Sequence, residues 1–133
     1  MNITVIAPME TQLRIEPRAI NLKSNMPKII ADVLLPEGTT ADNVNSNYRL
    51  MLYPNWPQIE PIEAFYQNVY QYKVNSIERT GILAYFEKPD LTSGIREGRD
   101  VEFKVVGKLT TGQFFFGSDT IKIIDPPGPK LRK

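Results

Sequence analysis

Short runs of alternating hydrophobic and polar residues recur along this chain, and they predict β-strands rather than helices. The clearest runs are residues 11–17, 19–22, 28–38, 81–87, 100–109 and 114–124. One face of the run 28–38 is apolar and is formed by Ile29, Ala31, Val33 and Leu35. Glycine and proline separate the runs. The pattern predicts a single antiparallel β-sandwich of immunoglobulin-like type with seven to eight strands.

The remaining segments are less regular. Residues 49–53 and 65–77 read as strands, the second with uncertain limits, whereas three prolines make 54–63 an extended loop or an edge. Residues 88–98 could hold one short helical turn. We therefore expect the domains to be an N-terminal arm or linker at 1–10, the sandwich at 11–124 and a proline-rich tail or linker at 125–133.

Three consecutive phenylalanines lie in the last predicted hairpin. Gly112 favours a three-residue loop at 110–112, which pairs Lys108 with Phe114 and then Gly107 with Phe115. Paired residues share a face of a sheet. In this register the core face contains Phe115, and Asp119 is its one polar member.

The same register leaves two phenylalanines outside the core. Phe114 and Phe116 fall beside Val106 on a face whose other members are polar. Two interpretations stay open. A neighbouring loop, such as the proline-rich one, covers these side chains, or they form a contact surface for another domain or protein subunit.

The segments "LRIEPRAINLKSN", "IIADVLLPEG", "ADNVNSNYRL" and "DVEFKVVGKLTTGQFFFGSDTIKII" cover roughly half the chain. With them the chain resembles a β-sandwich module of bacterial and archaeal secreted and surface proteins, a module often found beside calcium-binding repeats, polycystic-kidney-disease-like domains or dockerins. The resemblance implies a non-catalytic module that is extracellular or at the cell surface. It also implies an aromatic residue at Phe115 and polar residues or proline at Phe114 and Phe116.

The middle of the chain departs from that family. Members commonly carry a segment rich in Asp, Asn and Gly before the strand that corresponds to residues 81–87. Here Glu78 is the only carboxylate between Tyr66 and Gly81. Calcium needs several clustered oxygen ligands. No calcium or other metal site is therefore predicted, and no cofactor.

Composition narrows the possible functions. The 133-residue chain contains no histidine and no cysteine, which removes the usual general base, thiolate chemistry and the commonest zinc ligands. Its net charge of +1 gives no electrostatic case for binding nucleic acid. No apolar run is long enough for membrane insertion, and the N-terminal residues do not resemble a signal peptide. The few carboxylate pairs look like surface charges, so an enzyme is not expected.

Aromatic residues are dense between Tyr48 and Tyr72, which suggests a second function. Exposed rings at Tyr53, Trp56, Tyr66 and Tyr70 could stack on sugars in a carbohydrate-binding module that recognises a polysaccharide, although such rings also pack sandwich cores. The main expectation is a structural or interaction module of a multidomain protein. A subunit of a larger particle or appendage is a further alternative.

Overall fold

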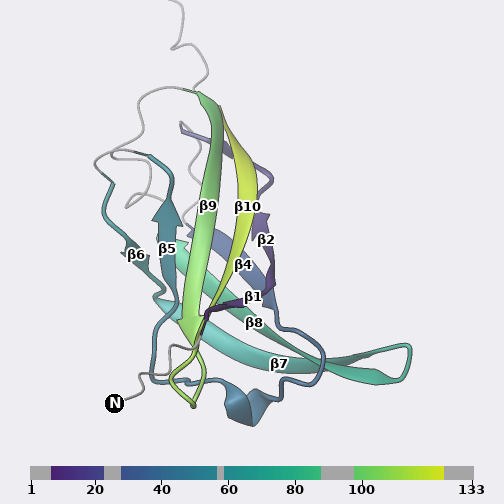
Figure 1. The fold of residues 1–133 in the computed structure, drawn as a ribbon. Coiled ribbons are helices and arrows are strands. Elements are labelled where there is room, and N and C mark those ends of the chain that lie inside the picture. The colour runs from purple at the N-terminus through teal and green to yellow at the C-terminus, as the bar shows by residue number, and fades with distance from the viewer. Residues whose placement is uncertain (1–6, 23–27, 57–58, 88–97, 125–133) are drawn as a thin grey trace, which may run out of the picture.

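The computed structural model describes residues 7–22, 28–56, 59–87 and 98–124. Within these ranges the chain forms β-strands and one 3-10 turn, Ala41–Asn43 (Figure 1). The strands are β1 (Met9–Glu10), β2 (Gln12–Glu16), β3 (Ala19–Asn21), β4 (Lys28–Leu34), β5 (Met51–Pro54), β6 (Ile62–Glu63), β7 (Tyr66–Val74), β8 (Ile77–Glu87), β9 (Arg99–Lys108) and β10 (Phe114–Ile124). Strands β1, β3 and β6 have only two or three residues, and the other seven are longer.

The strands form two sheets that pack face to face. Sheet A has the order β1-β10-β9-β5-β6, with β3 also paired to β10, and sheet B has the order β2-β4-β8-β7. Neighbouring strands are antiparallel except at the outer edge of β10, where β1 and β3 run parallel to it. The predicted all-β sandwich is confirmed. The two parallel pairings were not foreseen from the sequence.

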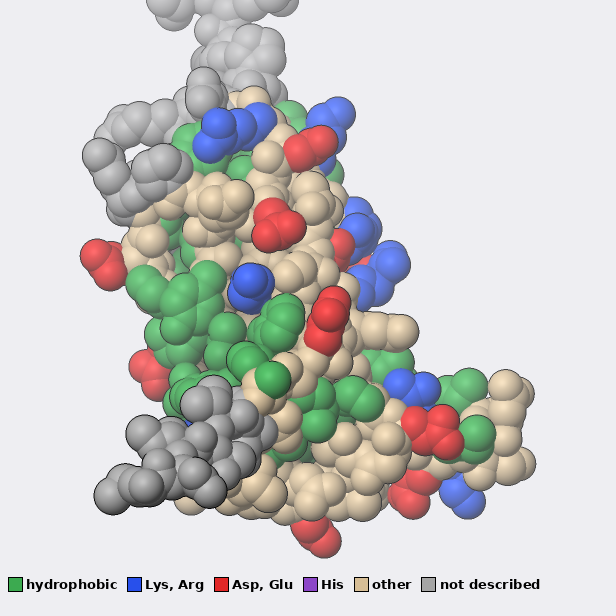
Figure 2. All heavy atoms as spheres, in the orientation of Figure 1, with side chains coloured by type: hydrophobic (Ala, Val, Ile, Leu, Met, Phe, Trp, Pro, Cys, Tyr) green, Lys and Arg blue, Asp and Glu red, His purple; other side chains and the backbone are tan. Residues whose placement is uncertain are grey.

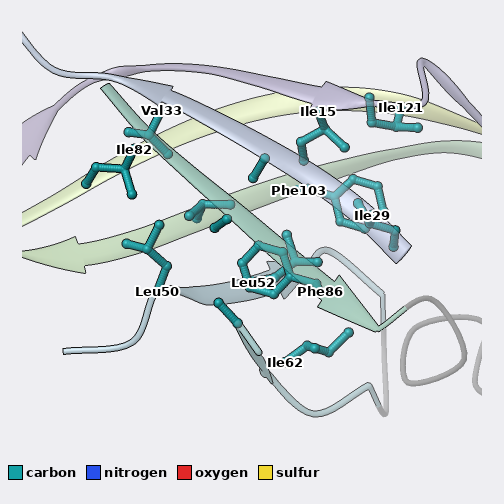
Figure 3. Close-up of a cluster of buried hydrophobic side chains, with 14 of the residues drawn as sticks. Ile15, Ile29, Val33, Leu50, Leu52, Ile62, Ile82, Phe86, Phe103 and Ile121 are labelled. Carbon is teal, nitrogen blue, oxygen red and sulfur yellow. The ribbon is translucent and has the colours of Figure 1, made fainter. Parts of the chain in front are cut away.

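The core lies between the sheets and is built by strand alternation (Figure 3). In sheet B, Ala31 of β4 pairs with Ala84 of β8, and the residues on either side of each pair alternate between buried and partly exposed. Sheet A contributes Leu52, Phe103 and Phe115, each 0 or 1% exposed. The apolar face predicted for residues 28–38 is therefore confirmed as a core face.

The predicted register of the last hairpin is also confirmed. Lys108 pairs with Phe114, and Gly107 pairs with Phe115. At the turn, Gly112 has a φ of +94°, a conformation that glycine adopts without steric cost. A side chain on Gly107 would place its Cβ 2.2 Å from the Phe115 ring, so the missing side chain leaves room for the central phenylalanine.

Residues 65–77 do not form one strand, which corrects the sequence-based interpretation. Strand β7 ends at Val74, and the chain reverses through Asn75 and Ser76, whose φ values of 51° and 67° are those of a tight two-residue hairpin turn. Figure 1 shows the resulting β7–β8 hairpin projecting beyond the sandwich. No glycine marks this turn, so the sequence signal for it was weak.

Several predicted segments lie partly or wholly outside the described residues. They are the first six residues of the arm at 1–10, the helical turn expected at 88–98 except for its last residue, and the tail at 125–133. Within the described part of the arm, Met9 and Glu10 pair with β10.

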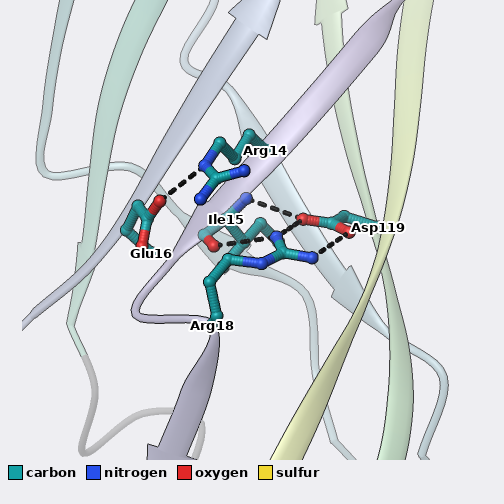
Figure 4. Close-up of polar contacts among 5 residues, drawn as sticks. All are labelled: Arg14, Ile15, Glu16, Arg18 and Asp119. Atoms are coloured by element: carbon teal, nitrogen blue, oxygen red, sulfur yellow. Dashed lines mark hydrogen bonds and ion pairs between the residues drawn. The ribbon is translucent and has the colours of Figure 1, made fainter.

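The N-terminal strands change from one sheet to the other, and this change explains why Asp119 can lie on the core face of β10. The chain passes from β1 in sheet A to β2 in sheet B and returns to sheet A at β3. Strand β2 is an edge of sheet B, where Ile15 directs its N–H and its carbonyl away from β4. The Asp119 carboxylate accepts the Ile15 N–H at 2.8 Å, and Arg18 Nη1 donates to the Ile15 carbonyl at 3.1 Å (Figure 4).

Asp119 and Arg18 also bind each other. Arg18 Nη1 pairs with Asp119 Oδ2, and Nη2 donates to Oδ1 at 3.2 Å. The two side chains together satisfy the backbone of an edge strand that has no neighbouring strand at this point. A charged residue on the core face is tolerated because its partners hold it at the seam between the sheets.

Candidate functional site

Hydrophobic side chains gather on the outer face of sheet A near the β9–β10 turn (Figure 2). Backbone pairing places Met51, Val106 and Phe116 in one row across β5, β9 and β10. Phe114 lies next to this row, opposite Lys108, and is 42% exposed. We call Met51, Val106, Phe114 and Phe116 the hairpin patch. The structure thus brings together the three residues predicted from the sequence and adds Met51.

The ring contacts found at the hairpin patch come from a tyrosine and two lysines. Tyr48, in the loop before β5, meets Phe114 edge-on with the ring centroids 5.9 Å apart. Lys108 Nζ lies 5.3 Å from the Phe114 centroid, and Lys104 Nζ lies 5.2 Å from the Phe116 centroid. Burial raises the pKa of Tyr48, with the charge of a neighbouring tyrosine as a second cause. These contacts leave Phe114 substantially exposed.

The four aromatic residues proposed for sugar stacking do not lie together. Tyr53 follows the buried Leu52 in β5 and faces outward from sheet A, where it is 41% exposed. Trp56 packs partly against the core, with the Arg99 guanidinium 4.0 Å from its ring centre. Tyr66 and Tyr70 lie on the opposite side of the molecule, on β7 of sheet B. No single platform can contain all four.

Sheet B carries its own aromatic row on its outer face. Tyr66 stacks on Tyr85 of the neighbouring strand at 4.9 Å and 26°. Tyr70 and Tyr72 stack on each other at 5.6 Å and 27°. Lys28 Nζ lies 4.0 Å above the centre of the Tyr85 ring. The row therefore comprises two stacked pairs, one toward each end of β7.

Tyr70 of β7 reaches across the neighbouring strand β8 to β4. Its ring lies on Gly81 of β8, where an added Cβ would come 2.4 Å from Tyr70 Cζ, and its hydroxyl donates to the Asp32 carboxylate of β4. Burial raises the pKa of the Tyr70 hydroxyl, and the hydrogen bond to Asp32 and the negative charge of that carboxylate raise it further. The glycine thus permits a cross-strand contact that fixes the tyrosine on the sheet surface.

A groove lies beside this tyrosine on the outer face of sheet B. Its volume is about 240 Å³, and it is lined by Gln12, Leu13, Arg14, Asp32, Leu34, Tyr70 and Tyr72. A second hollow of about 340 Å³ shares Gln12 and Leu34 with it and is lined further by Glu10, Thr11, Pro36 and Arg79. Sequence reasoning identified Tyr70 alone among these residues. Alternation along β4 could have placed Asp32 outward, but the pairing of β2, β4, β8 and β7 was not predictable.

Substitution of Gly81 by alanine tests the cross-strand contact. The new methyl group should displace the Tyr70 ring toward solvent and break its hydrogen bond to Asp32, lowering the free energy of unfolding by about 1 kcal/mol in urea titrations. On a Tyr70→Ala background the same substitution should cost less than about half of this value, because the clash is gone. An equal loss of unfolding free energy in both backgrounds would contradict the contact between the Tyr70 ring and Gly81.

Comparison with models of known protein families gives no match, and comparison with curated proteins gives none either. Among the residues that the structure describes, no three side chains of the His, Cys, Asp and Glu types cluster so as to hold a metal ion. The described residues also include no helix long and apolar enough to cross a membrane.

Proposed function

We propose that this chain is a non-catalytic interaction module, a sandwich of immunoglobulin-like type that docks against another protein domain or subunit through the hairpin patch. One observation carries the proposal, namely an exposed phenylalanine within an apolar cluster at the end of a β9–β10 face that is polar elsewhere. Away from the patch, the same face of β9 and β10 carries Glu102, Ser118, Thr120 and Lys122. A solvated sheet face has no need of the hydrophobic cluster, whereas a docking surface does.

The chemistry of the patch supports a protein partner. A phenylalanine flanked by lysine side chains provides both apolar contact area and charged groups at the rim, the arrangement usual at protein interfaces. The change of sheets by the N-terminal strands supports the immunoglobulin-like assignment. The resemblance to modules of secreted and surface proteins supports an extracellular or cell-surface location, and that location is part of the proposal.

Site-specific photocrosslinking tests the docking surface. A benzoylphenylalanine at position 114, in the parent protein within its cell of origin, should cross-link to one protein or to another domain of the same polypeptide. The same group at Ser118, on the same strand and face but outside the patch, should not. Val106→Asp in the same chain should abolish the product made from position 114. Absence of any product, or equal products from both positions, would overturn the proposal.

A further inference from the structure

The two adjoining hollows on the outer face of sheet B have the features of a site for an oligomeric ligand. They share Gln12 and Leu34, so they are neighbours on the surface rather than separate depressions. The first hollow, at about 240 Å³, is smaller than the usual pocket for a drug-sized ligand, about 300–1,000 Å³, and the second, at about 340 Å³, is at the lower end of that range. A chain of small units that places one unit in each hollow fits this arrangement better than one compact molecule.

The walls of the hollows combine aromatic and polar groups. The stacked pair of Tyr70 and Tyr72 provides an aromatic wall with Leu34 beside it. Gln12 provides an amide and Arg14 a guanidinium from the strand on the opposite side. The aromatic wall can pack against the C–H face of a sugar ring, while amide, guanidinium and carboxylate groups can bond its hydroxyls as donors and acceptors.

The charges of the side chains that line the two hollows limit the class of ligand. The lining contains two acidic side chains, Glu10 and Asp32, and two basic ones, Arg14 and Arg79, so the formal charges of the lining cancel, and Arg14 is also ion-paired with Glu16 beside it. A balanced lining favours neither a polyanion nor a polycation. Strands β4 and β8 are paired on both sides within the sheet, so the middle of this face offers side chains for recognition. An extended peptide that binds by adding a strand would pair with the edge strand β2 or β7 and would not lie along this face.

We propose that the outer face of sheet B binds a neutral oligosaccharide along the two hollows, with Tyr70 and Tyr72 as the stacking wall and Gln12, Arg14 and Asp32 as the polar contacts. This site is separate from the hairpin patch, which lies on the other sheet, and it does not depend on the docking proposal. It also differs from the aromatic set predicted from the sequence, because Tyr53 and Trp56 lie elsewhere and Tyr72 was not included. The Tyr70–Asp32 hydrogen bond holds one wall in place before any ligand arrives.

The test is an amide-shift NMR titration of the 133-residue chain with a panel of neutral hexasaccharides of glucose, xylose, mannose and N-acetylglucosamine. At least one should shift the amides of Gln12, Arg14, Leu34 and Tyr72 at millimolar concentration or below. Tyr72→Ala should weaken that binding by at least about tenfold, equivalent to about 1.4 kcal/mol. Gln12→Ala, at the opposite wall and in an exposed position, should weaken it as well.

Tyr66→Ala is the matched control, because Tyr66 is an exposed tyrosine on the same strand and face but outside both hollows. It should leave the affinity unchanged. The proposal is overturned if no neutral member of the panel shifts these amides, if the shifts occur on another face, or if Tyr66→Ala and Tyr72→Ala weaken binding equally. Binding of an acidic hexasaccharide alone would overturn it too. If the Tyr72→Ala variant does not fold, the affinity of the Gln12→Ala variant for the hexasaccharide tests the proposal instead.

Discussion

Replacing Phe115 by alanine is expected to lower the free energy of unfolding by about 3–5 kcal/mol, the range for removing a fully buried phenylalanine. Phe115 is 0% exposed and fills the space above Gly107, so its loss leaves a cavity between the sheets. Urea titration at neutral pH measures the effect.

Phe114→Ala is the matched control for this experiment. It removes the same side chain from the adjacent position on the same strand, but Phe114 is 42% exposed and lies outside the core. The loss of stability should be clearly smaller than for Phe115→Ala, because Phe114 buries less apolar area and its edge-on contact with Tyr48 adds only about 0.5–1.5 kcal/mol. Similar losses for Phe114→Ala and Phe115→Ala would contradict the register of the hairpin.

Replacing Asp119 by asparagine is expected to lower stability by about 1–3 kcal/mol at pH 7, because Arg18 loses its charged partner and a hydrogen bond becomes weaker. The contribution of the Asp119 carboxylate to the free energy of unfolding should depend on pH. Burial alone raises the pKa of Asp119, but the hydrogen bonds from Arg18 and from the Ile15 N–H, together with the charge of Arg18, outweigh it. The pKa in the folded protein therefore lies below the ordinary value.

The sign of the pH effect follows from this lowered pKa. The ionised carboxylate stabilises the fold fully above the pKa of the unfolded chain, about 3.9. The stabilisation is lost as the pH falls through the folded-state value. The stability difference between the wild type and Asp119→Asn should therefore be full at neutral pH and shrink below about pH 4. Urea titrations across this range measure it.

Glu102→Gln is the control for the aspartate experiment, because it removes a carboxylate from an exposed position on the neighbouring strand β9. Its effect on stability should stay within about 0.5 kcal/mol. A difference between the wild type and Asp119→Asn that does not change with pH would show that the carboxylate charge is not what stabilises the seam.

The parts of the fold that could be predicted from the sequence depend on local rules. The loop ending at Gly112 sets the register of β9 and β10, and alternation then assigns Phe115 to the core and Phe114 to the surface. The same alternation identified the buried face of β4. These signals need no knowledge of distant residues.

The remaining features depend on pairings between distant segments. The sequence alone provided no reason for a charged residue at Asp119 on the core face, because its partner Arg18 lies 101 residues away. Arg18 reaches Asp119 only because the N-terminal strands change from one sheet to the other. Tyr70 meets Asp32 across 38 residues and an intervening strand. The groove on sheet B results from such pairings, so composition could indicate an aromatic region but not the residues that line it.

The parallel pairing of β1 and β3 with β10 has a mechanical consequence. In a parallel pair, the start of one strand and the end of the other lie at opposite ends of the ladder. A force that pulls Met9 away from Ile124 would therefore load the β1–β10 and β3–β10 hydrogen bonds in shear, all together, rather than unzip them one after another. The short strands that close the edge of sheet A thus lie directly in the path of a tension carried along the chain.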